Sequence, residues 1–281
     1  MKLSEKKIKA NGITFNVASG GTGPVVLLLH GFPDTHAVWR KQTDALIAAG
    51  YRVVAPDLRG YGKTEAPAGV ANYTLELLRK DIVALLDVMK IERVYLVGHD
   101  WGAVIGWQLC IHAPERVERF AALSVGHPRA YVQAGLGQLL RAWYAVLFQL
   151  PWVAEKLVKA GNLAALKPYR ADDEQLADWR ANFAGEGRVT AALNYYRANV
   201  KLPGSGERKR LPVSVLGVWS EGDPALTEAQ MRDSERYVSG GFEYVRLDGD
   251  LGHWMQLKDP DRINDLLIGF GLGKPSAFPE A

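Results

Sequence analysis

Short apolar runs alternate with amphipathic stretches along the first half of the 281-residue chain. Residues 25–29 (Val-Val-Leu-Leu-Leu) are apolar without alternation, as expected for a parallel strand that is buried on both faces. Between residues 74 and 90, apolar side chains recur at helical spacing and predict an amphipathic helix. The other strands predicted in this half cover residues 13–17, 51–55, 94–97 and 121–125. This alternation predicts an α/β fold with a mainly parallel sheet.

The pattern changes after residue 128. From there to about residue 210 the segments are helical and aromatic-rich, and they show no pattern of a buried strand. The sequence therefore predicts a core of residues 1–128 and 212–281, with residues 129–211 inserted as a helical cap. The segment 203–206 (Pro-Gly-Ser-Gly) is predicted to be the flexible return to the core. The elements predicted after the cap are strands at 213–218 and 242–247 and a helix at 261–270.

Composition limits the possible functions. The chain is 48% hydrophobic and 23% charged with a net charge of +3, which fits a globular protein without a broad basic face for nucleic acid. Cys110 is the only cysteine, so no intrachain disulfide can form. Residues 1–7 lack the apolar stretch of a secretory signal, and the apolar region 136–158 is interrupted by charged residues and proline. We expect a cytoplasmic protein without a membrane span; the oligomeric state cannot be predicted.

The main candidate for chemistry is Asp100. It lies in Val-Gly-His-Asp-Trp-Gly-Ala (residues 97–103), between a predicted strand and a predicted helix. This is the setting of a nucleophile elbow, with an aspartate where serine hydrolases carry serine. A carboxylate can displace a leaving group at a saturated carbon and leave an alkyl ester that water then splits. The motif therefore favours hydrolysis of an epoxide or a carbon–halogen bond over hydrolysis of an ordinary ester.

A histidine and a second acid follow the elbow in the order typical of α/β hydrolases. His253 and Asp223 both come directly after predicted strands, where ligand sites form in open α/β sheets. A neutral imidazole can take a proton from water, and a carboxylate on its other nitrogen would orient it. Glu221 and Asp250 are alternative acids for this role.

The loop after residue 29 is predicted to stabilise negative charge. The backbone N–H groups of Phe32 and Trp101 would form an oxyanion hole and also hold the Asp100 carboxylate beforehand. Pro33 is a candidate for a cis peptide bond. The histidines show no metal-ligand spacing, so we predict neither a metal nor another cofactor.

Four motifs together resemble the α/β-hydrolase-fold epoxide hydrolases, and the resemblance runs from about residue 8 to residue 270. The motifs are His-Gly-Phe-Pro-Asp at 30–34, Asp-Leu-Arg-Gly-Tyr-Gly at 57–62, Gly-His-Asp-Trp-Gly at 98–102 and Gly-His at 252–253. In that family two cap tyrosines hydrogen-bond the epoxide oxygen. The resemblance assigns these roles to Tyr144 and Tyr196, with Tyr195 as the competitor for the second. The segment 57–62 itself is predicted to be structural.

The resemblance implies that an apolar epoxide and water are converted to a vicinal diol. Opening the epoxide ring creates an alkoxide, and a neutral phenol can donate the proton that the alkoxide needs. A haloalkane or haloacid dehalogenase with the same nucleophile is the main alternative. In haloalkane dehalogenases, the position of Trp101 supplies an indole N–H that binds halide. An esterase and a non-catalytic ligand-binding protein are the remaining alternatives.

Overall fold

One mixed sheet organises the part of the chain that the computed structural model describes, residues 3–200 and 210–273. Its strand order is β1-β2-β4-β3-β5-β6-β7-β8. The six strands from β4 to β8 in this order pair in parallel. Strands β1 and β2 form an antiparallel edge of the sheet. The strands are β1 (Ser4–Ala10), β2 (Ile13–Gly20), β3 (Val25–Leu29), β4 (Arg52–Pro56), β5 (Val94–His99), β6 (Val117–Leu123), β7 (Ser214–Ser220) and β8 (Phe242–Leu247).

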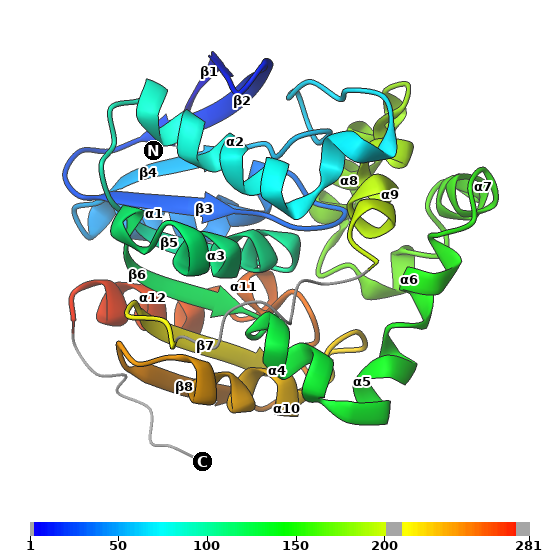
Figure 1. Cartoon of the computed structure of the whole chain (residues 1–281). Coiled ribbons are helices and arrows are strands. Elements are labelled where there is room, and N and C mark those ends of the chain that lie inside the picture. The colour runs from blue at the N-terminus through cyan, green and yellow to red at the C-terminus, as the bar shows by residue number, and fades with distance from the viewer. Residues whose placement is uncertain (1–2, 201–209, 274–281) are drawn as a thin grey trace.

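Helices cover both faces of this sheet, as the parallel strands require. In Figure 1, α2 and α3 lie in front of the sheet and α12 lies behind it. In the described residues between β6 and β7 there are six further α-helices, α4 to α9. The helices are α1 (Arg40–Ala48), α2 (Leu75–Val88), α3 (Trp101–His112), α4 (Pro128–Gln133), α5 (Gly135–Arg141), α6 (Trp143–Leu147), α7 (Val153–Lys159), α8 (Asp173–Ala184), α9 (Arg188–Ala198), α10 (Glu228–Arg232), α11 (Met255–Lys258) and α12 (Pro260–Gly271).

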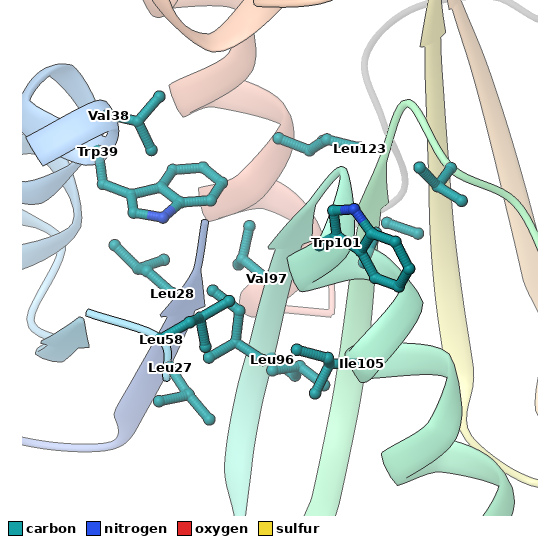
Figure 2. Packing of buried hydrophobic residues seen from close by; sticks show 14 of the residues in the cluster. Leu27, Leu28, Val38, Trp39, Leu58, Leu96, Val97, Trp101, Ile105 and Leu123 are labelled. Atoms are coloured by element: carbon teal, nitrogen blue, oxygen red, sulfur yellow. The ribbon is translucent and has the colours of Figure 1, made fainter. Parts of the chain in front are cut away.

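The end of β5 that leads into α3 lies within the hydrophobic core. Leu96 and Val97 of β5 lie among Leu27 and Leu28 of β3 and Ile105 of α3 (Figure 2). All five side chains are excluded from solvent. Because buried interiors are close-packed, this cluster gives the carboxyl end of β5 a rigid support.

Most predicted elements are confirmed, with differences at the margins of the sheet. The strand predicted at 121–125 is β6, which begins at Val117 and ends at Leu123, because the chain leaves the sheet at Ser124 with φ of 69°. Strand β1 was not predicted: most of its residues are exposed at the sheet edge, so it shows no buried apolar pattern. The predicted return at 203–206 lies outside the described residues.

The segment 57–62 has the structural role that was predicted. Asp57 accepts hydrogen bonds from the ring and the backbone N–H of His36 and from the backbone N–H of Lys63. Arg59 forms an ion pair with Asp81 at 2.6 Å, with both side chains buried. These contacts tie the loop after β4 to its neighbours. Within residues 3–200 and 210–273, no helix combines the length and apolar character needed to cross a bilayer.

Candidate active site

Asp100 occupies a sharp turn between β5 and α3, as the elbow motif predicts. Its φ and ψ angles are 51° and −122°, a conformation that non-glycine residues rarely adopt. The surrounding backbone and side chains leave no room for a side chain at Gly31 or Gly102. A Cβ atom on Gly102 would lie 2.0 Å from the carbonyl oxygen of Leu29, and one on Gly31 would lie 2.3 Å from the Cβ atom of Asp100. Glycine at these positions therefore allows the carboxylate to stand above the sheet.

The two carboxylate oxygens of Asp100 have different partners. Oδ1 accepts a hydrogen bond from the backbone N–H of Phe32 at 2.7 Å, and Oδ2 lies 3.6 Å from Nε2 of His253. Burial raises the pKa of Asp100, but the contacts with His253 and Phe32 outweigh it and leave the pKa below its usual value. Asp100 is thus held as a carboxylate. The predicted contribution of the Trp101 backbone N–H stays a prediction.

His253 lies between two carboxylates. Its Nδ1 is 2.9 Å from Oδ2 of Asp223, whose Oδ1 accepts backbone hydrogen bonds from Ala225 and Leu226. Burial lowers the pKa of His253, but the charge of Asp223 and the contacts with Asp100 outweigh it and raise the pKa to about 10. Two negative charges face one buried ring and favour its protonated form.

The alternative acids do not contact this ring. Glu221 is about half exposed and pairs with Arg246. Asp250 lies beside Gly222, where its Oδ1 would be 1.7 Å from an added Cβ atom. Asp223 is therefore the acid that the fold brings to His253.

His99, immediately before the nucleophile, supports the loop that carries His253. Its Nε2 lies 2.8 Å from the backbone carbonyl of His253, and the two rings are 4.6 Å apart. Burial and the neighbouring His253 charge lower the pKa of His99 to about 3. The ring is therefore neutral, and since a carbonyl only accepts, Nε2 carries the proton.

Two cavities meet at the nucleophile. One of about 230 Å³ and one of about 460 Å³ are both lined by Asp100, Tyr144 and Tyr196. Most of the other lining side chains are apolar, such as Phe148 in the smaller cavity and Val104 in the larger. The carboxylate and the two phenols are thus the polar groups that two mostly apolar cavities share, which suits a ligand with one reactive polar centre.

Both cavity tyrosines are neutral phenols. Burial raises the pKa of Tyr144 well above its usual value, and the nearby Tyr131 and Asp100 raise it further. Burial also raises the pKa of Tyr196 far above normal, with further contributions from Asp100 and Tyr144, against a lowering hydrogen bond from Trp101. The rings of Tyr144 and Tyr196 lie 6.0 Å apart at 85°. Two neutral phenols therefore line the same cavities as the Asp100 carboxylate.

Tyr195 is separated from this site. Its hydroxyl donates to the carbonyl of Arg59 at 2.7 Å, and its side chain is fully buried. Successive residues on a helix point about 100° apart, so α9 can direct only one of the pair toward the cavity. The structure places Tyr196, and not Tyr195, in the lining of both cavities.

Sequence reasoning missed a set of contacts between the helices of residues 128–198 and the catalytic loops. Buried Asp34 accepts hydrogen bonds from the indole N–H groups of Trp179 and Trp254 and from the amide of Gln175. Arg141 of α5 donates to the backbone carbonyl of Asp223. These partners are between 82 and 220 residues apart in sequence, so no local pattern could have revealed them. In the described parts of the chain, no cluster of His, Cys, Asp and Glu could hold a metal.

Known proteins resemble this chain over nearly its whole length. The profile of the family described as alpha/beta hydrolase fold matches residues 24–260. The chain is 36% identical to epoxide hydrolase 3 of Siraitia grosvenorii, over 92% of this chain and 94% of that protein. It is 34% identical to epoxide hydrolase 4 of Homo sapiens, over 94% and 77% respectively. A crystal structure of an epoxide hydrolase from Vigna radiata matches with a TM-score of 0.85 and 32% identity, over 97% and 98%. The similarity spans the strands and the helices between β6 and β7.

Proposed function

The chain belongs to the epoxide hydrolases of the alpha/beta hydrolase fold family, and we propose that it converts an apolar epoxide to a vicinal diol with five side chains: Asp100, His253, Asp223, Tyr144 and Tyr196. One observation carries this assignment. The carboxylate of Asp100 and the phenols of Tyr144 and Tyr196 line the same two cavities, although they come from separate parts of the chain. A nucleophile opposite two proton donors is what opening an epoxide ring requires.

The first step forms an ester on the enzyme. Because Oδ1 of Asp100 is held by the backbone N–H of Phe32, Oδ2 is the oxygen that attacks an epoxide carbon. The new bond joins Oδ2 to that carbon, and the bond between the carbon and the epoxide oxygen breaks. Tyr144 or Tyr196 donates its phenolic proton to the alkoxide that results.

Ester formation changes the protonation of His253. The negative charge at 3.6 Å from Nε2 disappears, so one of the two charges that raise the pKa of His253 is lost. The imidazolium then gives its proton to the tyrosine that has become a phenolate, which restores the neutral phenol. The neutral ring takes a proton from water as that water attacks the ester carbonyl carbon. The backbone N–H of Phe32 would stabilise the oxyanion on Oδ1. Collapse breaks the bond between Oδ2 and the carbonyl carbon, so Oδ2 leaves with the product. The leaving alkoxide takes the proton of the hydroxyl group that came from water, which releases the diol and leaves Asp100 as a carboxylate and His253 as an imidazolium.

We extend the proposal to the organisation of the chain. Residues 1–128 and 212–281 form the catalytic core, and residues 129–211 form a cap that supplies both tyrosines. The helices α4 to α9 between β6 and β7 support this division. A cytoplasmic location is kept as part of the proposal.

The dehalogenase alternative is less well supported. The hydrogen bond that lowers the pKa of Tyr196 comes from Trp101, so this indole is engaged by a proposed proton donor. The two rings lie 5.1 Å apart, edge to face. The similar proteins described above are named epoxide hydrolases.

The test combines turnover with trapping of the ester. Wild-type protein is assayed for diol from aryl and aliphatic epoxides, with haloalkanes in parallel, and Asp100→Ala is expected to abolish diol formation. In His253→Gln, ester formation should continue while its hydrolysis stops. Intact-protein mass spectrometry should then show an adduct with the mass of the epoxide, and peptide mapping should place it on the peptide that contains Asp100. Asp250→Ala is the matched control, a nearby carboxylate outside the triad. Full turnover by Asp100→Ala, or an adduct on another residue, would refute the mechanism.

A further inference from the structure

Exposed apolar side chains are concentrated on one part of the molecule. Of the fifteen large apolar side chains that are exposed in the described residues, ten lie between residues 132 and 157. The most exposed reach 78% for Trp152 and 76% for Leu136. We call the following six residues the apolar cap face: Leu136, Leu139, Leu140, Trp143, Val146 and Trp152. Clustered exposure of this kind marks an interaction surface, whereas single exposed apolar residues are ordinary.

The helices that carry the apolar cap face lie at the periphery. In Figure 1, α5, α6 and α7 form an arc along one edge of the molecule. Leu140 is 73% exposed and Val146 is 71% exposed, so these side chains project from the surface. Side chains that project in this way can insert into the interface of a lipid bilayer.

Nearly all charged residues in the segment 132–167, which carries this face, are positive. Between residues 132 and 167 the only acid is Glu155, which is paired with Arg197 at 2.7 Å. Lys156 and Lys159 are both exposed on α7. A helical surface with tryptophan, leucine and valine on it and lysine beside it is typical of segments that lie in the interface of an anionic membrane.

The apolar cap face is continuous with the cavities at Asp100. Trp143 lines the smaller cavity, and Leu139 and Val146 line the larger one. A second protein copy seated on this face would cover side chains that border both cavities. A lipid surface would instead be a reservoir for apolar molecules next to them. The position of the cavities therefore favours lipid over protein as the occupant.

We propose that the apolar cap face docks this protein onto the surface of bilayers that contain anionic phospholipid, with α5, α6 and α7 lying in the interface. The side chains of Leu136, Leu140 and Trp152 enter the acyl boundary, and Lys156 and Lys159 face the headgroups. Delivery of apolar epoxides from the bilayer rests on the proposed function, whereas the docking itself does not.

The test is vesicle flotation with the full chain, using phosphatidylcholine mixed with phosphatidylglycerol and phosphatidylcholine alone. Wild-type protein is expected to float with the anionic vesicles, less so at high salt. The variant Leu136→Ser/Leu140→Ser/Trp152→Ser should bind about tenfold more weakly or worse, because three inserted side chains are lost. None of these residues lines either cavity, so its turnover of a water-soluble epoxide should match that of wild type.

A matched control removes exposed apolar side chains elsewhere. Val70→Ser/Val88→Ser/Leu272→Ser changes residues that are 42%, 54% and 53% exposed outside the cap face, and it should float like wild type. Lys156→Glu/Lys159→Glu should abolish the preference for anionic vesicles while leaving the apolar contacts in place.

Several outcomes would overturn the proposal. They are absence of wild-type flotation with either vesicle, equal losses in the cap-face and control variants, and a wild-type dimer in analytical ultracentrifugation that the cap-face variant dissociates. The last result would make this face an interface between copies. Flotation requires no turnover, so loss of the docking proposal and loss of the epoxide hydrolase mechanism would be recognised separately.

Discussion

The protonation of His253 should depend on the charge of Asp100, and this dependence can be measured without substrate. Nε2 of His253 lies 3.6 Å from Oδ2 of Asp100, and Nδ1 lies 2.9 Å from Oδ2 of Asp223. The substitution Asp100→Asn removes the first charge and keeps the shape of the side chain. Formation of the proposed alkyl ester removes the same charge, so the variant reproduces the electrostatics of that intermediate.

The expected size of the change follows from the distance. Two unit charges 3.6 Å apart interact by about 4 to 5 kcal/mol at an effective dielectric constant of about 20. One pKa unit corresponds to about 1.4 kcal/mol. Loss of the Asp100 charge is therefore sufficient to move the pKa of His253 from about 10 into the neutral range, where the ring can act as a base.

The assay is an NMR titration of the histidine rings in wild-type protein and in Asp100→Asn. His253→Gln identifies the signal. His99, whose pKa is lowered to about 3, should remain neutral in both proteins and serves as an internal reference. Asp250→Asn is the control, because it removes a charge from the loop that carries His253 at a position that does not contact the His253 ring.

Two results would refute the reasoning. If His253 of wild type titrates near the usual histidine value, the two carboxylates do not hold the proton that the structure implies. If the pKa of His253 stays near 10 in Asp100→Asn, ester formation could not convert the imidazolium into a base. The proton for water activation would then need another acceptor.

Four further substitutions test three separate parts of the structure. Tyr196→Phe should lower kcat/KM by about 10² to 10³-fold through loss of a proton donor, whereas Tyr195→Phe should mainly lower the free energy of unfolding, by about 1 to 2 kcal/mol, as steady-state kinetics and urea titration will show. Asp81→Ala should lower the free energy of unfolding by about 3 to 5 kcal/mol, because Arg59 would remain buried without its partner. Asp57→Asn should lower the free energy of unfolding by about 2 kcal/mol at neutral pH. It should also reduce the decrease of the urea unfolding midpoint at acid pH.

The sign of the last effect follows from the pKa of Asp57. Burial raises it, but the hydrogen bond and charge of His36 outweigh burial and lower it to about 2. A lowered acid pKa contributes stability above the unfolded value, near pH 4, and this contribution is lost as the pH falls through about 2. An unchanged acid limb in Asp57→Asn would contradict this account.

Controls separate the other two effects. Combining Arg59→Met with Asp81→Leu should recover much of the lost stability, since it leaves no unpaired charge. Equal losses of kcat/KM in Tyr195→Phe and Tyr196→Phe would contradict the assignment of the proton donor to Tyr196 alone of the pair.

The elbow could be predicted from sequence because its determinants are local. Gly98, Asp100 and Gly102 are neighbours in the chain, and the apolar run before them identifies a buried strand. Asp223 and His253 each follow one of the last two strands, and this order along the chain was sufficient to predict that they pair. The choice between Tyr195 and Tyr196 needed the rotation of α9, which depends on packing against distant residues.

Other features could not be predicted because they depend on the tertiary structure. Edge strand β1 is mostly exposed, so its charged sequence carries no buried pattern. The pKa of His253 depends on two carboxylates separated from each other by more than a hundred residues. The apolar stretch around residues 136–157 is too interrupted to indicate a membrane span, and only the structure shows that so many of its side chains are exposed.

The contacts of Asp34 bear on how a substrate reaches Asp100. Burial raises the pKa of Asp34 to about 6, while hydrogen bonds from Trp179, Trp254 and Gln175 act in the opposite direction. Trp179 and Gln175 belong to α8, and Trp254 directly follows His253. Moving α8 away from the sheet would leave a buried carboxylate without two of its three donors, which is costly. We therefore expect α8 to stay docked during turnover, so that entry occurs between α5, α6 and α7, where the cavities meet the apolar cap face.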